Sequence, residues 1–190
     1  TPLLEMQDIS MHFGATKALD GVDFVCKAGE VHAVLGENGA GKSTLMKLIA
    51  GVIQPTQGRL RVEGQEVSLN APKTALKHGL VCMFQELSLV PDLTVRENLL
   101  LGAPGAGLGW LKGRGLEKAQ SVLDRIDGAD IKMSQRVSDL TLPQRQQVEI
   151  AKAIMKKPRL LILDEATSAL SASVVEKVFD LVREERDAGT

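Results

Sequence analysis

A glycine-rich segment has the composition needed to hold phosphate groups. It fits the pattern G-x-x-x-x-G-K-S/T, and its residues are Gly36, Glu37, Asn38, Gly39, Ala40, Gly41, Lys42, Ser43 and Thr44. Glycine lets the chain curl tightly enough for several backbone N–H groups to point at phosphate oxygens. In such loops the lysine, here Lys42, reaches the β- and γ-phosphates, and the hydroxyl, here Ser43, binds Mg²⁺. The segment therefore predicts a site for a nucleoside triphosphate with magnesium.

Two acids follow a fully apolar run. Leu160–Leu163 ends directly at Asp164 and Glu165. A carboxylate at the carboxyl end of a strand beside the phosphate-loop strand can hold the water shell of Mg²⁺, which assigns Asp164. Glu165 is then placed to polarise a water in line with the γ-phosphate as general base. An acid pair after a strand is also a common helix-capping turn, and it is the phosphate loop that favours the catalytic interpretation.

The elements that would position these residues alternate between strand and helix. A short β-branched run, Val31–Leu35, predicts a buried strand before the loop, and Lys42–Ala50 predicts a helix after it. Leu80–Phe84 predicts another buried strand. Strands alternating with helices imply a mainly parallel α/β sheet. Leu4–Phe13 and Val22–Cys26 alternate between apolar and polar residues and predict antiparallel strands at one edge.

The remaining segments predict a small strand pair and several helices. From Val95 to about Asp127 the pattern is helical, interrupted by a glycine-rich stretch, Gly102–Gly115, that carries Trp110 and reads as a loop. The other predicted elements are strands at Arg59–Val62 and Glu66–Leu69 and helices at Gln144–Met155 and Ser173–Asp187.

Composition narrows the possible functions. The chain has 190 residues, 44% of them apolar and 25% charged, which is typical of a globular domain. A net charge of −1 gives no general attraction to nucleic acid. No apolar run approaches the roughly 20 residues needed to cross a bilayer. We therefore expect any membrane role to work through a partner, and we expect no nucleic-acid partner.

Beyond the loop and the acids, nearly the whole chain resembles the ATP-binding subunits of ABC transporters. Phe13 lies 23 residues before Gly36, where the family places an aromatic ring that stacks on adenine. Gln85 stands at the family's Q-loop glutamine, which contacts Mg²⁺ or the attacking water. Glu86–Leu99 is similar to the stretch that leads into the helical subdomain and contacts the membrane partner. The alternatives are core packing for Phe13 and an ordinary surface glutamine for Gln85.

The family's signature, L-S-G-G-Q, is altered. It falls at Leu140, Thr141, Leu142, Pro143 and Gln144. In the family the serine and the second glycine meet the γ-phosphate of ATP held by the opposite domain. Thr141 can still offer a hydroxyl, but Leu142 and Pro143 replace both glycines, and proline has no N–H. We expect the composite ATP site completed by this signature to hydrolyse poorly; the alternative is a plain helix start. In the family's D-loop, which falls at Ser168–Ser171, Ser171 replaces the aspartate, and this is expected to weaken communication between the sites.

The resemblance implies an ABC-type P-loop NTPase fold. This has a mainly parallel sheet core, an antiparallel β edge subdomain and an inserted α-helical subdomain. We expect its parts at residues 1–85 (β edge and phosphate loop), 86–156 (helical part with the signature) and 157–190 (metal-side strand, D-loop and last helix). The family's switch histidine follows the acids, whereas all three histidines here precede Asp164. We therefore expect a C-terminally truncated domain that binds ATP with Mg²⁺ but shows little turnover alone.

Several details resemble the N-terminal half of tandem ATPases that serve monosaccharide importers of the ribose, galactose or xylose type. They include Gln85-Glu86-Leu87 and Val148–Lys152. The resemblance implies ATP hydrolysis coupled to sugar import, with the chain peripheral at the cytoplasmic side of the membrane. The implied partners are a second ABC ATPase domain on the same full-length chain, transmembrane permease subunits and, indirectly, a periplasmic or extracellular sugar-binding protein. Two alternatives stay open: a soluble ABC ATPase in translation or DNA repair, and a non-hydrolysing nucleotide sensor, against which Asp164 and Glu165 argue.

Overall fold

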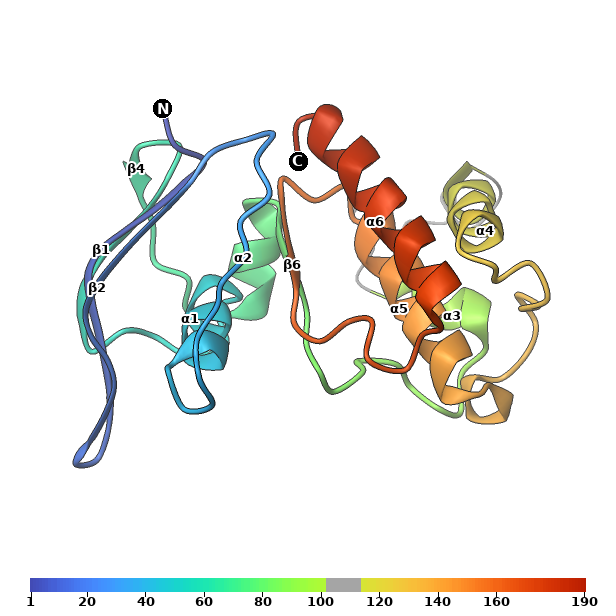
Figure 1. Ribbon diagram of the computed structural model, residues 1–190, viewed down its shortest axis with the longest axis horizontal. Coiled ribbons are helices and arrows are strands. Elements are labelled where there is room, and N and C mark those ends of the chain that lie inside the picture. The colour runs from blue at the N-terminus through green and yellow to red at the C-terminus, as the bar shows by residue number, and fades with distance from the viewer. Residues whose placement is uncertain (102–113) are drawn as a thin grey trace. The chain divides into compact units, whose positions relative to one another are not determined.

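The computed structural model describes residues 1–101 and 114–190, which form two compact units (Figure 1). Unit 1 comprises Thr1–Cys82, Arg159–Ile162 and Glu185–Thr190, and unit 2 comprises Met83–Pro158 and Leu163–Glu184. Most of the expected glycine-rich loop, including Trp110, lies outside the described residues.

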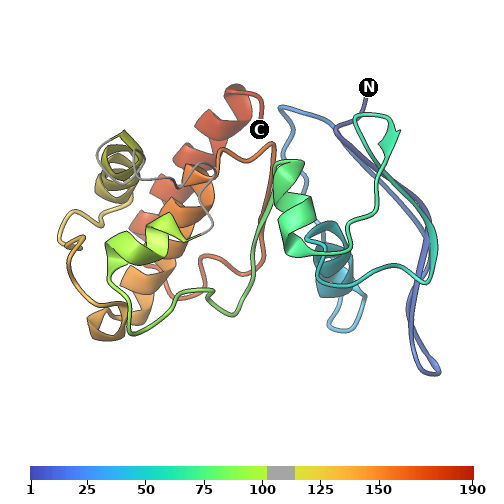
Figure 2. The ribbon, with the colours of Figure 1, turned by 180° about the vertical axis from the view of Figure 1, so that it is seen from behind.

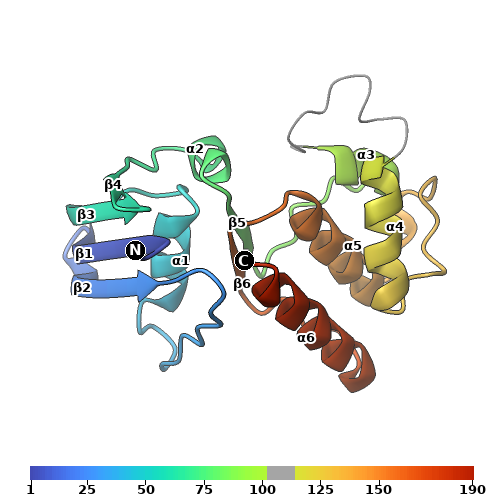
Figure 3. The same cartoon turned by 90° about the horizontal axis from the view of Figure 1, so that it is seen from above.

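Unit 1 is built on an antiparallel sheet with the strand order β2-β1-β3-β4. Its strands are β1 (Leu4–Phe13), β2 (Thr16–Cys26), β3 (Gln57–Val62) and β4 (Gln65–Glu66). Alternation in β1 buries Leu4 and Met6, which share a core with Leu45 and Leu48 of α1 (Lys42–Ile49). Figure 3 shows α1 against one face of this sheet. The expected antiparallel edge is confirmed, although its last strand is shorter than the predicted Glu66–Leu69.

The parallel part of the fold consists of two strands, β5 (Leu80–Met83) and β6 (Leu160–Leu163). The Leu160 amide donates to the Gly79 carbonyl at 3.2 Å, and the Asp164 amide donates to the Met83 carbonyl at 3.0 Å. Because both partners advance together along the chain, the strands run in the same direction. A short helix that the sequence pattern did not predict, α2 (Pro72–Lys77), precedes β5.

The expected buried strand at Val31–Leu35 is wrong. The segment is irregular, with Val31 62% exposed and Leu35 89% exposed. Within the described ranges, its amides and carbonyls make no backbone hydrogen bonds. Apolar, β-branched composition favours a strand, but a strand forms only where a neighbour completes the ladder. The phosphate loop is therefore preceded by an irregular, unpaired segment and not by a paired strand.

Unit 2 is helical and centres on α5 (Leu142–Met155), in which all residues from Gln146 to Met155 are buried. Around it lie α3 (Val95–Leu100), α4 (Arg114–Arg125), the 3₁₀ helix η2 (Val137–Asp139) and α6 (Ala172–Asp187). Figure 2 shows α5 beside α3. The predicted helix at Gln144–Met155 is confirmed, with a start two residues earlier. Over residues 1–101 and 114–190, no helix is both long enough and apolar enough to traverse a bilayer.

Candidate active site

The phosphate loop in unit 1 curls through two left-handed glycines. Gly39 and Gly41 both have φ +85°, a conformation open to glycine at little cost. Gly41 is also the N-cap of α1. A Cβ atom there would lie 2.5 Å from the Ala18 carbonyl oxygen and 2.7 Å from Leu19 Cδ2. The loop therefore requires glycine at residue 41 for both conformation and space.

The start of α1 presents amide donors. The first bond of this turn is from the Leu45 amide to the Gly41 carbonyl, at 2.9 Å. Among the described residues, the amides of Lys42, Ser43 and Thr44 find no acceptor, because no helical carbonyl precedes them and the glycine cap offers no side-chain acceptor. Such a cluster at the positive end of a helix dipole favours an anion. The Ser43 side chain is exposed at the same turn.

The Lys42 ammonium lies over the loop that precedes it. Its Nζ donates to the Gly36 carbonyl at 2.6 Å and to the Glu37 carbonyl at 2.9 Å. These bonds hold the positive charge against the loop's own backbone. The loop thus combines a cation with amide donors, which is the chemistry that a polyphosphate requires.

Phe13 ends β1 beside the turn to β2, where it pairs with Thr16. Its side chain is 51% exposed, which excludes the core-packing alternative. An exposed ring in the unit that carries the phosphate loop offers a face for stacking.

The two acids in unit 2 follow β6 directly. Asp164 is half-buried and its amide closes the last bond to β5, while Glu165 is exposed. Glu165 has φ +52°, a left-handed conformation that costs a residue with a Cβ about 1–2 kcal/mol. The turn is closed by the Ser168 amide, which donates to the Glu165 carbonyl at 3.2 Å. Four other non-glycine residues among those described share this conformation, so the turn geometry fixes the backbone at Glu165 without marking it as functional.

Gln85 lies two residues beyond the end of β5 and is exposed. Because β5 and β6 run in parallel and join through Met83 and Asp164 at 3.0 Å, the structure brings Gln85 to the same edge as Asp164 and Glu165. The phosphate-loop residues belong to unit 1 and these three residues to unit 2. Each half of the predicted site is therefore assembled within its own unit.

A contact that the sequence did not predict joins α5 to the D-loop. Gln146, 5% exposed, donates through Nε2 to the Ser168 hydroxyl at 3.1 Å and accepts the Ala169 amide at 3.1 Å. Periodicity could have shown that Gln146 faces the core with the apolar residues of α5, but not which loop it meets.

The altered signature forms the capped start of α5. Thr141 is the N-cap, and its hydroxyl accepts from the Gln144 amide at 3.4 Å, while the Thr141 amide donates to Gln144 Oε1 at 2.9 Å. Gln144 Nε2 donates to Asp130 Oδ2 at 3.0 Å. Leu142 is 55% exposed, and Pro143 lies in the first turn. The side chains of Thr141 and Gln144 are thus hydrogen-bonded within the chain, and Gln144 also contacts a carboxylate.

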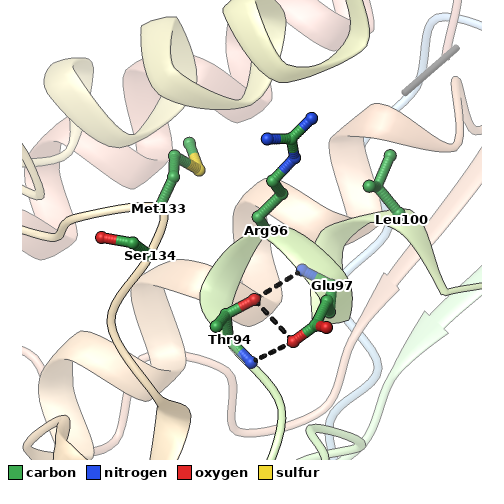
Figure 4. Close-up of a pocket in the computed structure, with 6 residues that line it drawn as sticks. All are labelled: Thr94, Arg96, Glu97, Leu100, Met133 and Ser134. Atoms are coloured by element: carbon green, nitrogen blue, oxygen red, sulfur yellow. Dashed lines mark hydrogen bonds between the residues drawn. The ribbon is translucent and has the colours of Figure 1, made fainter. Parts of the chain in front are cut away.

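A mostly apolar groove lies along α3 in the segment expected to meet a membrane partner (Figure 4). Its volume is about 610 Å³, and it is lined by Thr94, Arg96, Glu97, Leu100, Met133 and Ser134. Thr94 and Glu97 form a capping box at one end, in which the Thr94 amide donates to Glu97 Oε2 at 2.8 Å. These bonds, the backbone bond first, hold the pKa of Glu97 below its ordinary value.

Comparison with known proteins places the whole chain in a family. Residues 19–168 match the family described as ABC transporter. The chain is 47% identical over 189 residues to "Ribose import ATP-binding protein RbsA 1" of Mesorhizobium japonicum and 43% identical over 190 residues to "Ribose import ATP-binding protein RbsA 2" of Escherichia coli O157:H7. These alignments cover 99% and 100% of the chain, but only 37% of each relative.

Solved structures share the fold. One described as a nucleotide-free ATP-binding cassette from an ABC transporter superposes with a TM-score of 0.82 at 28% identity, covering 100% of this chain and 79% of the other. Another, described as the ATP binding subunit of an ABC transporter, gives a TM-score of 0.85 at 28% identity over 99% and 76% of the two chains.

Proposed function

Because this chain belongs to the ABC transporter family, we propose that it binds Mg-ATP and that the intact protein hydrolyses it to drive import of a sugar. The observation that carries the proposal is the phosphate loop, with two left-handed glycines, amide donors at the start of α1 and the Lys42 ammonium. The sugar is proposed to be ribose or a similar monosaccharide, because the relatives that match the chain are named for ribose import.

Each unit carries oxygen atoms of the kind that magnesium binds. Mg²⁺ prefers hard oxygen ligands and keeps several waters. The Ser43 hydroxyl is exposed on the first turn of α1, Asp164 stands half-buried at the end of β6, and the Gln85 amide lies exposed beyond β5. We assign these three residues to the ion from their chemistry and from their positions in the family's motifs, and the ion would neutralise charge on the β- and γ-phosphates.

In the proposed reaction, some side chains bind the nucleotide and others activate the attacking water. The loop amides and Lys42 bind and orient the phosphates, and the Phe13 ring stacks on the adenine. Glu165 accepts a proton from the attacking water as general base, with Gln85 orienting that water. Asp164 and Glu165 are both present, so hydrolysis is favoured over a purely sensory role.

Two ATPase domains would form two composite ATP sites. We further propose that the site completed by this chain's signature hydrolyses ATP more slowly than the other. Leu142 and Pro143 remove the glycine amides, and the Thr141 hydroxyl is engaged with Gln144. Asp130 adds a carboxylate beside the helix start, which disfavours an anion there. The productive ATP would then be the one held by this chain's own phosphate loop and covered by a second ATPase domain.

The groove along α3 is proposed to receive the transmembrane permease subunits. Its apolar lining and the Thr94–Glu97 cap give a rigid, partly apolar surface on unit 2. The chain would then act as a peripheral protein at the cytoplasmic side of the membrane, contacting the sugar-binding protein only through the permease.

Replacing Lys42 with alanine tests the proposal. The variant is expected to bind a fluorescent ATP analogue at least about 100-fold more weakly, because a charge-assisted contact to phosphate is lost. Lys47→Ala is the matched control, since Lys47 is an exposed lysine in the last turn of the same helix. Equal affinities for Lys42→Ala and Lys47→Ala would refute the phosphate-loop assignment.

A further inference from the structure

Two buried charges of α5 hold the loop that follows Gln85. Glu149 and Lys152 are 6% and 5% exposed. The Ser88 hydroxyl donates to Glu149 Oε1 at 2.5 Å, and the Lys152 ammonium donates to the Ser88 carbonyl at 3.1 Å and to its hydroxyl at 3.2 Å. A charge taken out of water needs such partners. Burial lowers the pKa of Lys152, while Glu149 opposes that shift. The main chain three residues after Gln85 is thereby tied to α5.

The same helix holds the turn that follows Glu165. Gln146 binds Ser168 and Ala169 through both ends of its side-chain amide. Ser168 in turn donates its amide to the Glu165 carbonyl. Gln146 and Lys152 thus project from one helix to the two loops that carry the candidate water-orienting group and the candidate base.

The strand pair alone does not hold these loops together. The last bond between the two segments joins the Asp164 amide to the Met83 carbonyl, and Gln85 and Glu165 both lie beyond it. Each loop has its second fixed point on α5, because Lys152 holds one and Gln146 holds the other. Fixing both ends of a short loop removes most of its conformational freedom.

We propose that α5 sets the separation of Gln85 and Glu165, with Lys152 and Gln146 as positioning residues for hydrolysis. This inference rests on the proposed ATPase function. In-line attack needs the water, the base and the orienting group within a narrow range of positions, so loosening either loop reduces turnover more than binding. A helix that served only as core would need apolar residues at these positions and would not need the bonds to Ser88 and Ala169.

Amide hydrogen exchange, followed by NMR on the chain itself, tests the anchoring without any need for turnover. The reporters are the Val90 amide, which donates to Asn98 Oδ1 at 2.7 Å, and the Ser168 amide, because neither donates to the substituted side chains. Lys152→Met is expected to speed exchange at Val90, and Gln146→Leu at Ser168, by about tenfold or more.

Matched variants separate anchoring from general destabilisation. Lys156→Met removes the half-buried lysine at the C-cap of α5, whose side chain makes no hydrogen bond within the described ranges, and it should leave both reporters unchanged. Ser88→Ala removes the loop-side hydroxyl without touching α5 and should speed exchange at Val90 less than Lys152→Met does, because the bond from Lys152 to the carbonyl of residue 88 remains. Unchanged reporters in both anchor variants, or equal changes with Lys156→Met, would overturn the inference.

Steady-state kinetics of the intact protein then tests positioning. Lys152→Met is expected to lower kcat on the order of 10- to 100-fold, while KM for ATP stays within about twofold and Lys152→Arg recovers most of kcat. A rise in KM with kcat unchanged would contradict a positioning role. If the parent protein shows no Lys42-dependent turnover, the proposed function fails, and the exchange data alone decide whether α5 anchors the loops.

Discussion

At the scale of single residues, two glycines of the phosphate loop have the same backbone conformation but differ in the space available for a side chain. Gly39 and Gly41 share φ +85°, but a Cβ atom on Gly39 would meet nothing within 4 Å, whereas one on Gly41 would lie 2.5 Å from the Ala18 carbonyl oxygen. We predict that Gly39→Ala lowers the free energy of unfolding by about 1 kcal/mol, the left-handed penalty. Gly41→Ala should lower it by about 1–3 kcal/mol more, because backbone must move.

Urea denaturation of the two variants measures this difference directly. Gly41→Ala should also bind ATP more weakly than Gly39→Ala, since displacement of the loop from Ala18 misdirects the amides at the start of α1. Equal loss of stability in the two variants would show that the close approach at Gly41 relaxes without strain.

The sequence predicts the site residues that belong to a motif, but it does not predict the residues whose role depends on tertiary packing. Lys42 and Asp164 stand at fixed places in a pattern whose chemistry dictates the residue type. Gln146, Glu149 and Lys152 are polar residues in an amphipathic helix, where such side chains normally face water. Their burial arises because neighbouring loops cover α5, and no local pattern encodes those distant contacts.

At the scale of elements, the capping box of α3 makes part of its stability depend on pH. Thr94 holds the pKa of Glu97 below the ordinary value of 4.5. The charged carboxylate therefore adds stability that is present above about pH 4.5 and is lost as pH falls through the lower pKa of the folded state. We predict that the gap in unfolding free energy between the parent and Glu97→Gln is constant above about pH 5.5 and narrows in acid.

Chemical denaturation at several pH values checks this prediction. Glu176→Gln provides the control, because Glu176 is an exposed acid of α6 whose side chain makes no hydrogen bond in the described part of the chain. A gap for Glu97→Gln that does not vary with pH would mean that the neutral amide replaces the carboxylate fully in the cap.

The elements differ in how far the sequence determines them. The start of α5 is encoded locally, because Thr141 and Gln144 cap each other within one turn. Val31–Leu35 has a composition typical of strands but no ladder partner within the described ranges, so its pattern was misleading. The helix α2 has only six residues, too few for a clear period, and Pro72 at its first turn was the one available signal.

At the scale of the whole molecule, the proposed transport cycle requires that ATP binding and ATP hydrolysis be separable. Binding groups lie in unit 1, whereas Glu165 lies in unit 2. ATP that binds the closed arrangement of two ATPase domains more tightly than the open one would supply the work, and hydrolysis would release it. Removing the base without changing the loop should therefore stop the cycle after binding.

Glu165→Gln makes this separation, since glutamine keeps the shape of the side chain but cannot accept the proton. We predict that turnover by the intact protein falls at least about 100-fold, with ATP affinity retained, and that labelled ATP stays bound through gel filtration. Glu86→Gln, at an exposed acid next to Gln85, should behave as the parent. Normal turnover in Glu165→Gln would show that another group takes the proton, whereas loss of binding would mean that the left-handed turn at residue 165 also supports the nucleotide site.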